Sequence, residues 1–311
     1  MIPSDLLEQH LRILQVFQYG LKNGLSLRDV FDILEDSPTL KSPLGQKYQE
    51  LIFYLQENGG ARPPHDWNGS YFLPSTKMLF SLGWMMGLLD SSAGVAYQLL
   101  LCRTFQNTGS DGLLFQRYFI ELLRQGTPLP LLLEVLSSEW DEHEVKAIVS
   151  DLQKVMQTGE SLVPIFEKHQ NFIGHEFSNC FQKFEKSGEM VHLTDYLQTE
   201  SQRSWFEEIL KKSRIRGSDG FYKFWGDHIQ NGESLIHGLQ QAIQRFPDFR
   251  NIKIWQDILG VAGENFDDVI SAIDKSSLSR MEKAFVNTGL RAGILPEILK
   301  DLDFLIRGQE A

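Results

Sequence analysis

The segment LRQGTPL, residues 123–129, predicts how this chain folds, because similar segments occur twice more: LKNGLSL at 21–27 and IQNGESL at 229–235. Apolar residues lie three and seven positions from the central glycine on both sides, as expected for one apolar helix face before and after a break. Glycine suits the left-handed residue that ends a helix, and Ser or Pro two positions later suits the start of the next. Each segment therefore predicts a helical hairpin. The turn glycines are Gly24, Gly126 and Gly232.

These hairpins belong to a longer sequence repeat, of which the chain has three copies. About 60 residues beyond each first turn lies a second turn glycine with apolar neighbours, and a third turn lies between the two. The second turn glycines are Gly87, Gly188 and Gly293, and the intervening ones are Gly59 with Gly60, Gly159, and Gly263. Three turns in each copy predict six helices in each copy. The tetrapeptide GSDG, at 109–112 and 217–220, marks where one copy ends and the next begins, with Ser or Asp available to cap the new helix.

The repeat divides the chain into copies at 1–108, 109–216 and 217–311. No segment shows sustained alternation of apolar and polar residues, so we predict an all-α fold of tandem six-helix bundles built from antiparallel helix hairpins. The middle copy is the most regular, and the other two are divergent. The first copy carries a Pro- and Gly-rich loop at 58–75, where the middle copy has a shorter turn.

The composition is that of an ordinary globular protein and disfavours several functions. Hydrophobic residues make up 42% and charged residues 23% of the 311 residues. The net charge of −11 repels polyanions, so nucleic acid is not an expected partner. Cys102 and Cys180 lie in apolar helical patterns without a Cys-x-x-Cys neighbour, which predicts two buried thiols in a reducing compartment. Acidic residues near the start of the chain argue against a signal peptide.

One apolar region, residues 78–102, raises the question of a membrane span, which needs about 20 mostly apolar residues. Its uncharged part stops at Asp90. A buried helix pair and a membrane element are the two interpretations. The repeat favours the buried pair, because Gly87 would be the turn of a hairpin.

Three ordered motifs stand in the middle copy: Gly126-Thr-Pro128-Leu, then Gly159-Glu-Ser-Leu, then Phe-Glu185-Lys-Ser-Gly188-Glu-Met. In this order and spacing they resemble the cytoplasmic F domain of the type II secretion and type IV pilus inner-membrane platform proteins. That family has Gly-x-Pro-Leu, Gly-x-Ser-Leu and Gly-Glu-x-Ser-Gly-x-Leu. The resemblance implies bundles of three antiparallel helix pairs and a scaffold that acts through protein contacts in a secretion or pilus machine. The partners it implies are the hexameric ATPase, a platform subunit or a cytoplasmic adaptor.

The chain also departs from that family. The first copy has Trp84 and Met86, and the third has Leu290 and Ala292, where the family has Glu and Ser. Platform proteins carry two such domains, each followed by membrane-spanning helices, whereas the segment after the second copy here is too charged to insert. We therefore expect a soluble, cytoplasmic relative without a transmembrane segment. Peripheral association with the inner face of the cytoplasmic membrane and homo-oligomerisation stay open. The alternative is a helical-repeat adaptor whose partner lies outside secretion.

Motifs for catalysis or for cofactor binding are missing from the sequence. It contains no phosphate-binding loop, dinucleotide fingerprint, nucleophile elbow or His-Glu-x-x-His pair. We therefore predict a protein that is not an enzyme and has no cofactor, no catalytic residue and no metal site. An enzyme with a site between the copies is the remaining alternative from another class.

Several polar clusters have both a functional and a structural interpretation. The acidic segment 137–148 around His143 suggests either a divalent-ion site or a serine-capped helix with acidic residues in its first turn, and segment 263–268 is similar. His169 and His175 flank Gly174 at an expected turn. The basic segment 211–216 suits a helix C-terminus or an acidic partner. Glu185 is either a helix-end residue that contacts a neighbouring turn or a binding residue. The structural interpretation is preferred for each.

Overall fold

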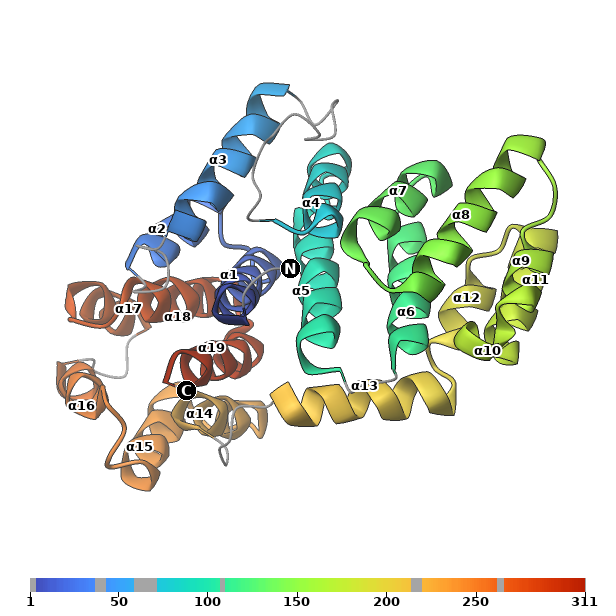
Figure 1. The fold of residues 1–311 in the computed structure, drawn as a ribbon. Helices are drawn as coiled ribbons and strands as arrows, with labels where there is room; N and C mark the ends of the chain where they lie inside the picture. Colours follow the sequence, from blue (N-terminus) through green and yellow to red (C-terminus); the bar gives the residue numbers. More distant parts are fainter. Residues whose placement is uncertain are drawn as a thin grey trace. The chain divides into compact units, whose positions relative to one another are not determined.

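The computed structural model describes residues 4–36, 43–58, 72–106, 110–213, 220–261 and 266–310. Over these residues the protein is all-α, with no strand, which confirms the predicted fold class (Figure 1). The chain divides into two compact units. Unit 1 comprises Met1–Leu7 with Glu50–Arg214, and unit 2 comprises Glu8–Gln49 with Ile215–Ala311. One boundary between them falls within α1 (Ser4–Lys22), after Leu7, and another within α3 (Pro43–Asn58), after Gln49.

Unit 1 contains the helices from α4 to α13: α4 (Pro74–Met86), α5 (Leu89–Phe105), α6 (Asp111–Arg124), α7 (Leu129–Glu139), α8 (His143–Thr158), α9 (Val163–Lys168), α10 (Gln170–Ile173), α11 (His175–Ser187), α12 (Val191–Tyr196) and α13 (Glu200–Ser213). Unit 2 contains most of the first hairpin and the last six helices: α1 (Ser4–Lys22), α2 (Leu27–Asp36), α14 (Phe221–Gln230), α15 (Leu235–Arg245), α16 (Ile252–Val261), α17 (Phe266–Lys275), α18 (Arg280–Ala292) and α19 (Leu295–Glu310).

The two units do not follow the three predicted copies, because the first copy is shared between them. Its first hairpin belongs to unit 2, where Asn23 and Lys22 bind the carboxylate of Asp301 on α19 at 2.8 and 3.1 Å. Arg280 at the start of α18 pairs with Asp36 at the end of α2 at 2.9 Å. Its second hairpin, α4 with α5, belongs to unit 1 and packs on α7 and α13. The division into three copies thus stays a prediction about the sequence.

The predicted first hairpins are confirmed by their turns. All three glycines have a left-handed φ, between 79° and 91°. The residue after each glycine donates its N–H to the carbonyl five positions earlier: Leu25 to Gly20, Thr127 to Leu122 and Glu233 to His228, at 3.0 to 3.1 Å. This hydrogen bond is the mark of a Schellman helix end. Three segments far apart in the sequence therefore fold into the same local structure.

The later turns agree in conformation as well. Gly87, Gly159, Gly188 and Gly293 all have φ between 67° and 72°. Two intervening turn positions of the repeat, Gly59 with Gly60 and Gly263, lie outside the described residues, as does the greater part of loop 58–75. Glycine is required at the left-handed positions because an L side chain there would crowd the following carbonyl.

The starts of the helices are only partly as predicted. Ser26 accepts a hydrogen bond from Asp29 N, Ser234 accepts one from His237 N, and Pro128 precedes the first residue of α7. However, Ser110 of the first GSDG does not cap α6 with its side chain, so the predicted serine cap is wrong there, whereas Ser218 and Asp219 of the second GSDG lie outside the described residues. The side chain of Asp111 lies in the first turn of α6, where the helix dipole favours an acidic residue.

Over the described residues, the third copy has the predicted six helices. The middle copy has eight, because its later segments are broken into short helices, one of which ends at Gly174 with φ 73°. The described part of the first copy has five. The predicted count of six is therefore wrong for the middle copy. Its extra helix breaks have no counterpart in the described residues of the other two copies, so the repeat pattern did not predict them.

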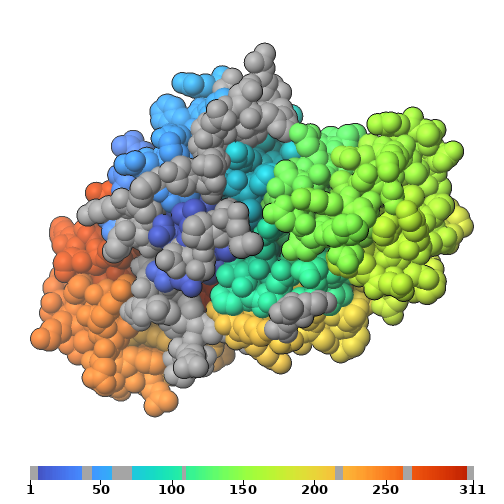
Figure 2. All heavy atoms as spheres, viewed as in Figure 1, coloured from blue at the N-terminus to red at the C-terminus, as the bar shows by residue number. Residues whose placement is uncertain are grey.

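The core of unit 1 surrounds α5, whose buried side chains cover nearly its whole circumference. A Cβ on Gly83 of α4 would lie 2.6 Å from Ser92 Cβ of α5, so glycine permits this close approach. Figure 2 shows α13 in yellow against the atoms of the α5–α6 region, and α13 contacts α5. Phe119, Phe166 and Phe181 form an edge-to-face aromatic cluster on the other side of α6. The core of unit 2 is aromatic too, with Trp225 and Trp255 fully buried.

The apolar region 78–102 forms the helix pair α4 and α5, and most of its side chains are buried within unit 1. In the part of the chain that the structure describes, no helix has the length and apolar character to cross a membrane. The buried-pair interpretation of this region is therefore confirmed.

We expect the fragment 50–214, which follows unit 1, to be more stable than the fragment 109–216, which follows the middle copy. The shorter fragment lacks α4 and α5 and would expose the faces of α6, α7 and α13 that they cover. Thermal unfolding followed by circular dichroism should give a Tm about 10 °C lower for the shorter fragment. Equal melting temperatures would favour the copies over the compact units.

Candidate functional site

The motif carboxylate Glu185, at the end of α11, caps a helix that is not its own. Leu162 N donates to Glu185 Oε1 at 2.7 Å, and Ser161 Oγ donates to Oε2 at 2.5 Å. These residues precede α9, which has no local side-chain cap. The contact joins the Gly159-Glu-Ser-Leu motif to the motif ending at Gly188. The geometry is that of a helix-end residue contacting a neighbouring turn.

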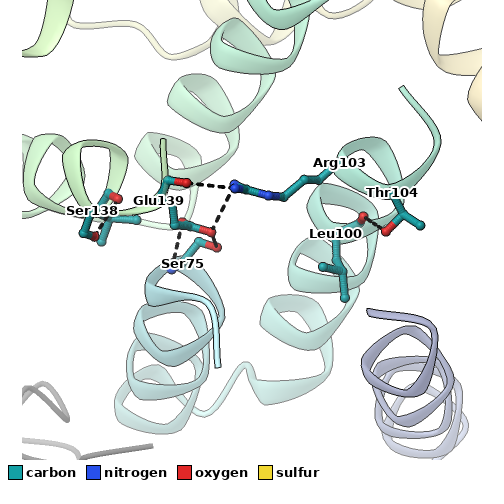
Figure 3. Close-up of polar contacts among 7 residues, drawn as sticks. Ser75, Leu100, Arg103, Thr104, Ser138 and Glu139 are labelled. Carbon is teal, nitrogen blue, oxygen red and sulfur yellow. Dashed lines mark hydrogen bonds and ion pairs between the residues drawn. The ribbon is translucent and has the colours of Figure 1, made fainter. Parts of the chain in front are cut away.

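A second carboxylate, Glu139, does the same for α4 in the interior of unit 1 (Figure 3). Ser75 N donates to Glu139 Oε2 at 3.0 Å, and Ser75 Oγ donates to Oε1 at 2.9 Å. Arg103 on α5 places Nη1 3.8 Å from Oε1, and its Nη2 donates to the main-chain carbonyl of Glu139 at 2.8 Å. Burial raises the pKa of Glu139 to about 7, against the opposing effects of Arg103 and Ser75.

A third carboxylate, Asp303 on α19, caps α14 in unit 2. Tyr222 N donates to Asp303 Oδ1 at 3.1 Å. The last glycine of the second GSDG makes room for it, because a Cβ on Gly220 would lie 2.2 Å from Oδ1. We refer to Glu139, Glu185 and Asp303 as the capping carboxylates. Each places a carboxyl oxygen at the start of a helix and accepts a hydrogen bond from a main-chain N–H that the helix leaves free.

The capping carboxylates therefore hold helices together. Each oxygen described above is occupied by a donor from the protein. Over the described residues, no three His, Cys, Asp or Glu side chains are grouped so as to hold a metal ion. Sequence reasoning singled out Glu185 as a motif residue and included Glu139 in the acidic segment 137–148, but it predicted the capping role for neither Glu139 nor Asp303, because their partners are distant in the sequence.

The acidic segment 137–148 differs from its structural prediction. Neither serine caps α8: Ser137 and Ser138 lie within α7, and α8 starts at His143 with no side-chain cap. Asp141, outside the helices, pairs with Lys146 at 2.9 Å. The prediction of a serine-capped helix is therefore wrong. A serine before acidic residues is typical of a helix start, but here α7 continues through both serines to Glu139, which is buried.

The remaining clusters are surface or helix-end features where the structure describes them. His169 Nε2 lies 3.1 Å from Asp151 Oδ2, to which Lys168 also donates at 2.6 Å. The hydrogen bonds from Lys168 and His169 lower the pKa of Asp151 to about 2. Lys211 and Lys212 stand in the last turn of α13, as predicted for a helix C-terminus. Segment 214–219 and the first part of segment 263–268 lie outside the described residues.

The two thiols differ in burial. Cys102 is buried on α5, and burial raises its pKa to about 12, whereas Cys180 on α11 is only partly buried. Both are free thiols. The prediction of two buried thiols therefore holds for Cys102 and is wrong for Cys180, whose helix packs one face against the core and leaves this position near its edge.

The second turns expose apolar side chains that sequence reasoning did not single out. Around Gly87, Met85 is 56%, Met86 55% and Leu88 45% exposed. Val191 after Gly188 and Ile294 after Gly293 are 49% and 39% exposed. The signal was the run WMMGLL at 84–89, where the resembling family has polar residues. Exposed apolar groups of this kind are typical of binding surfaces when they cluster.

Comparison with models of known protein families, with curated proteins and with solved structures found no match for this chain. The resemblance of the middle copy to the F domain therefore rests on the three motifs quoted above.

Proposed function

We propose that this chain is a non-enzymatic scaffold or assembly protein that resembles the cytoplasmic domains of the type II secretion and type IV pilus platform and acts through protein contacts. Its partner would be a hexameric cytoplasmic ATPase, a platform subunit or a cytoplasmic adaptor. It would work in the cytoplasm, at the inner face of the cytoplasmic membrane, and without a cofactor. The motifs of the middle copy and the all-α hairpin architecture support this proposal.

The observation that carries the proposal is the apolar group formed by Met85, Met86 and Leu88, which we call the Gly87 tip. Three apolar side chains within four positions are each about half exposed. Methionine is flexible and polarisable, so a methionine-containing surface adapts to the shape of a partner. Exposed to water, these apolar side chains do not stabilise the fold of this acidic chain. Binding a partner would bury the Gly87 tip and remove its apolar surface from water.

The test is affinity purification of the tagged full chain from its own cells, with mild cross-linking and mass spectrometry. A variant with Met85→Ser, Met86→Ser and Leu88→Ser should recover the partner about tenfold less, which corresponds to a loss of about 1.4 kcal/mol of binding free energy. Val261→Ser is the control, because Val261 is an apolar side chain that is 75% exposed in unit 2. Circular dichroism checks that both variants stay folded.

Recovery of a secretion or pilus ATPase or platform subunit that depends on the Gly87 tip would support the proposal. Recovery of an unrelated complex, with no secretion component above background, would favour an adaptor that works outside secretion. Equal recovery by the triple variant and the wild type would overturn the role of the Gly87 tip.

A further inference from the structure

Glu139 is a buried acid at a junction of three helices. Its side chain has no exposed surface, and it stands at the end of α7, between the start of α4 and the end of α5 (Figure 3). Both of its oxygens accept hydrogen bonds from Ser75, the second residue of α4. The pair therefore fixes the first turn of α4 to the last turn of α7.

The groups that face Glu139 do not fully neutralise its charge. Arg103 of α5 is its cationic neighbour, but at 3.8 Å, and its guanidinium is also engaged by the Glu139 carbonyl and the ring of Trp140. Tyr118 of α6 has a raised pKa, mainly because of burial and then because of the charge on Glu139. Asp141, beyond the end of α7, is directed to Lys146 of α8. An ionised Glu139 thus keeps a desolvation cost that its partners do not remove.

Protonation preserves the contacts of the junction. The neutral acid accepts the Ser75 N–H with its carbonyl oxygen and donates its O–H to Ser75 Oγ, which reverses one hydrogen bond without breaking it. Arg103 keeps its hydrogen bond to the main-chain carbonyl and its stacking on Trp140. The neutral form therefore loses little on closing, whereas the ionised form must give up its hydration.

We propose that the α4–α7 junction is a pH-responsive latch, held tightly when Glu139 is protonated and loosened when it is ionised. The sign follows from proton linkage. The pKa of Glu139 is about 7 when the side chain is buried and near its ordinary value of 4.5 when the junction opens, so the closed state binds more protons between these values. The closed state is then lost progressively as the pH rises from 4.5 to 7, by up to about tenfold per pH unit.

The amide of Ser75 reports on the latch directly, because its hydrogen bond is to the carboxylate itself. Residue-resolved hydrogen exchange of the full chain, corrected for intrinsic rates, should give a protection factor about 100-fold higher at pH 5 than at pH 8. The side chain of Glu139→Gln cannot ionise. In this variant the Ser75 protection factors at pH 5 and pH 8 should therefore agree within about threefold. The Leu162 amide is a control in the same chain, because its carboxylate partner Glu185 is exposed.

A Ser75 protection factor that does not change with pH, or that changes equally in Glu139→Gln, would overturn the latch. A carbon-13 titration of the Glu139 carboxyl group in the wild-type chain gives an independent test if the variant fails to fold. A midpoint near 7 supports the latch, and a midpoint below about 5, close to that of an ordinary carboxyl, overturns it.

Discussion

Gly112→Ala is expected to destabilise unit 1 by about 3 kcal/mol and to lower its Tm by about 10 °C. Gly112 is the second residue of α6 and the last glycine of the first GSDG. A Cβ there would lie 2.0 Å from the main-chain oxygen of Phe172 on α10. Because the clash is with backbone, no side-chain rotation relieves it, and α6 and α10 must move apart.

Gly126→Ala is the matched control for this prediction. Gly126 ends the hairpin turn with φ 79°, and a Cβ there would meet no atom within 4 Å. Its substitution costs only the left-handed strain, about 1 kcal/mol. Thermal unfolding of both full-length variants by circular dichroism makes the comparison. If the two variants are equally stable, α10 moves away from the added methyl group without a measurable loss of stability.

This pair of glycines also shows what the sequence could predict. A glycine at a helix end leaves a local signature, an apolar face before it and a helix start after it, so the turns at Gly24, Gly126 and Gly232 were predictable. Gly112 and Gly220 needed glycine for another reason, the close approach of Phe172 O and of Asp303. Those partners lie far along the chain, so the repeated GSDG could be read as a boundary but not as a pair of tight contacts.

The same distinction explains the candidate site. Glu185 was found because it belongs to a motif that includes its neighbouring turn, and its contact with Ser161 spans 24 positions. Glu139 meets Ser75 across 64 positions and two predicted copies, and nothing local distinguishes it from the exposed acids that follow it. Long-range pairing also explains why the compact units differ from the copies. Periodicity predicts which face of a helix is buried, but not which helix covers it.

The second large effect is expected for Glu282→Ala, which should destabilise unit 2 by about 4 kcal/mol. Glu282 is fully buried in the first turn of α18. Its Oε1 accepts from Tyr222 Oη at 2.5 Å and from Asn251 Nδ2 at 2.6 Å, and its Oε2 accepts from Ser279 N and Oγ at 3.0 and 2.7 Å. Alanine leaves the buried Tyr222 hydroxyl and the half-buried Asn251 amide without this acceptor, and that loss exceeds the gain from removing a buried charge.

Glu200→Ala is the control, since Glu200 also stands in the first turn of a helix but is exposed and pairs with Arg203 three positions on. Its loss should be much the smaller of the two, because an exposed ion pair adds little to stability. Glu282→Gln should lie between the two, because its single carbonyl oxygen can serve only one side of the network. Urea unfolding of the full chain, followed by circular dichroism, ranks the three variants. If Glu282→Ala unfolds at the same urea concentration as Glu200→Ala, then Tyr222 and Asn251 find other acceptors, and Glu282 is no longer required to join α14, α16 and α18.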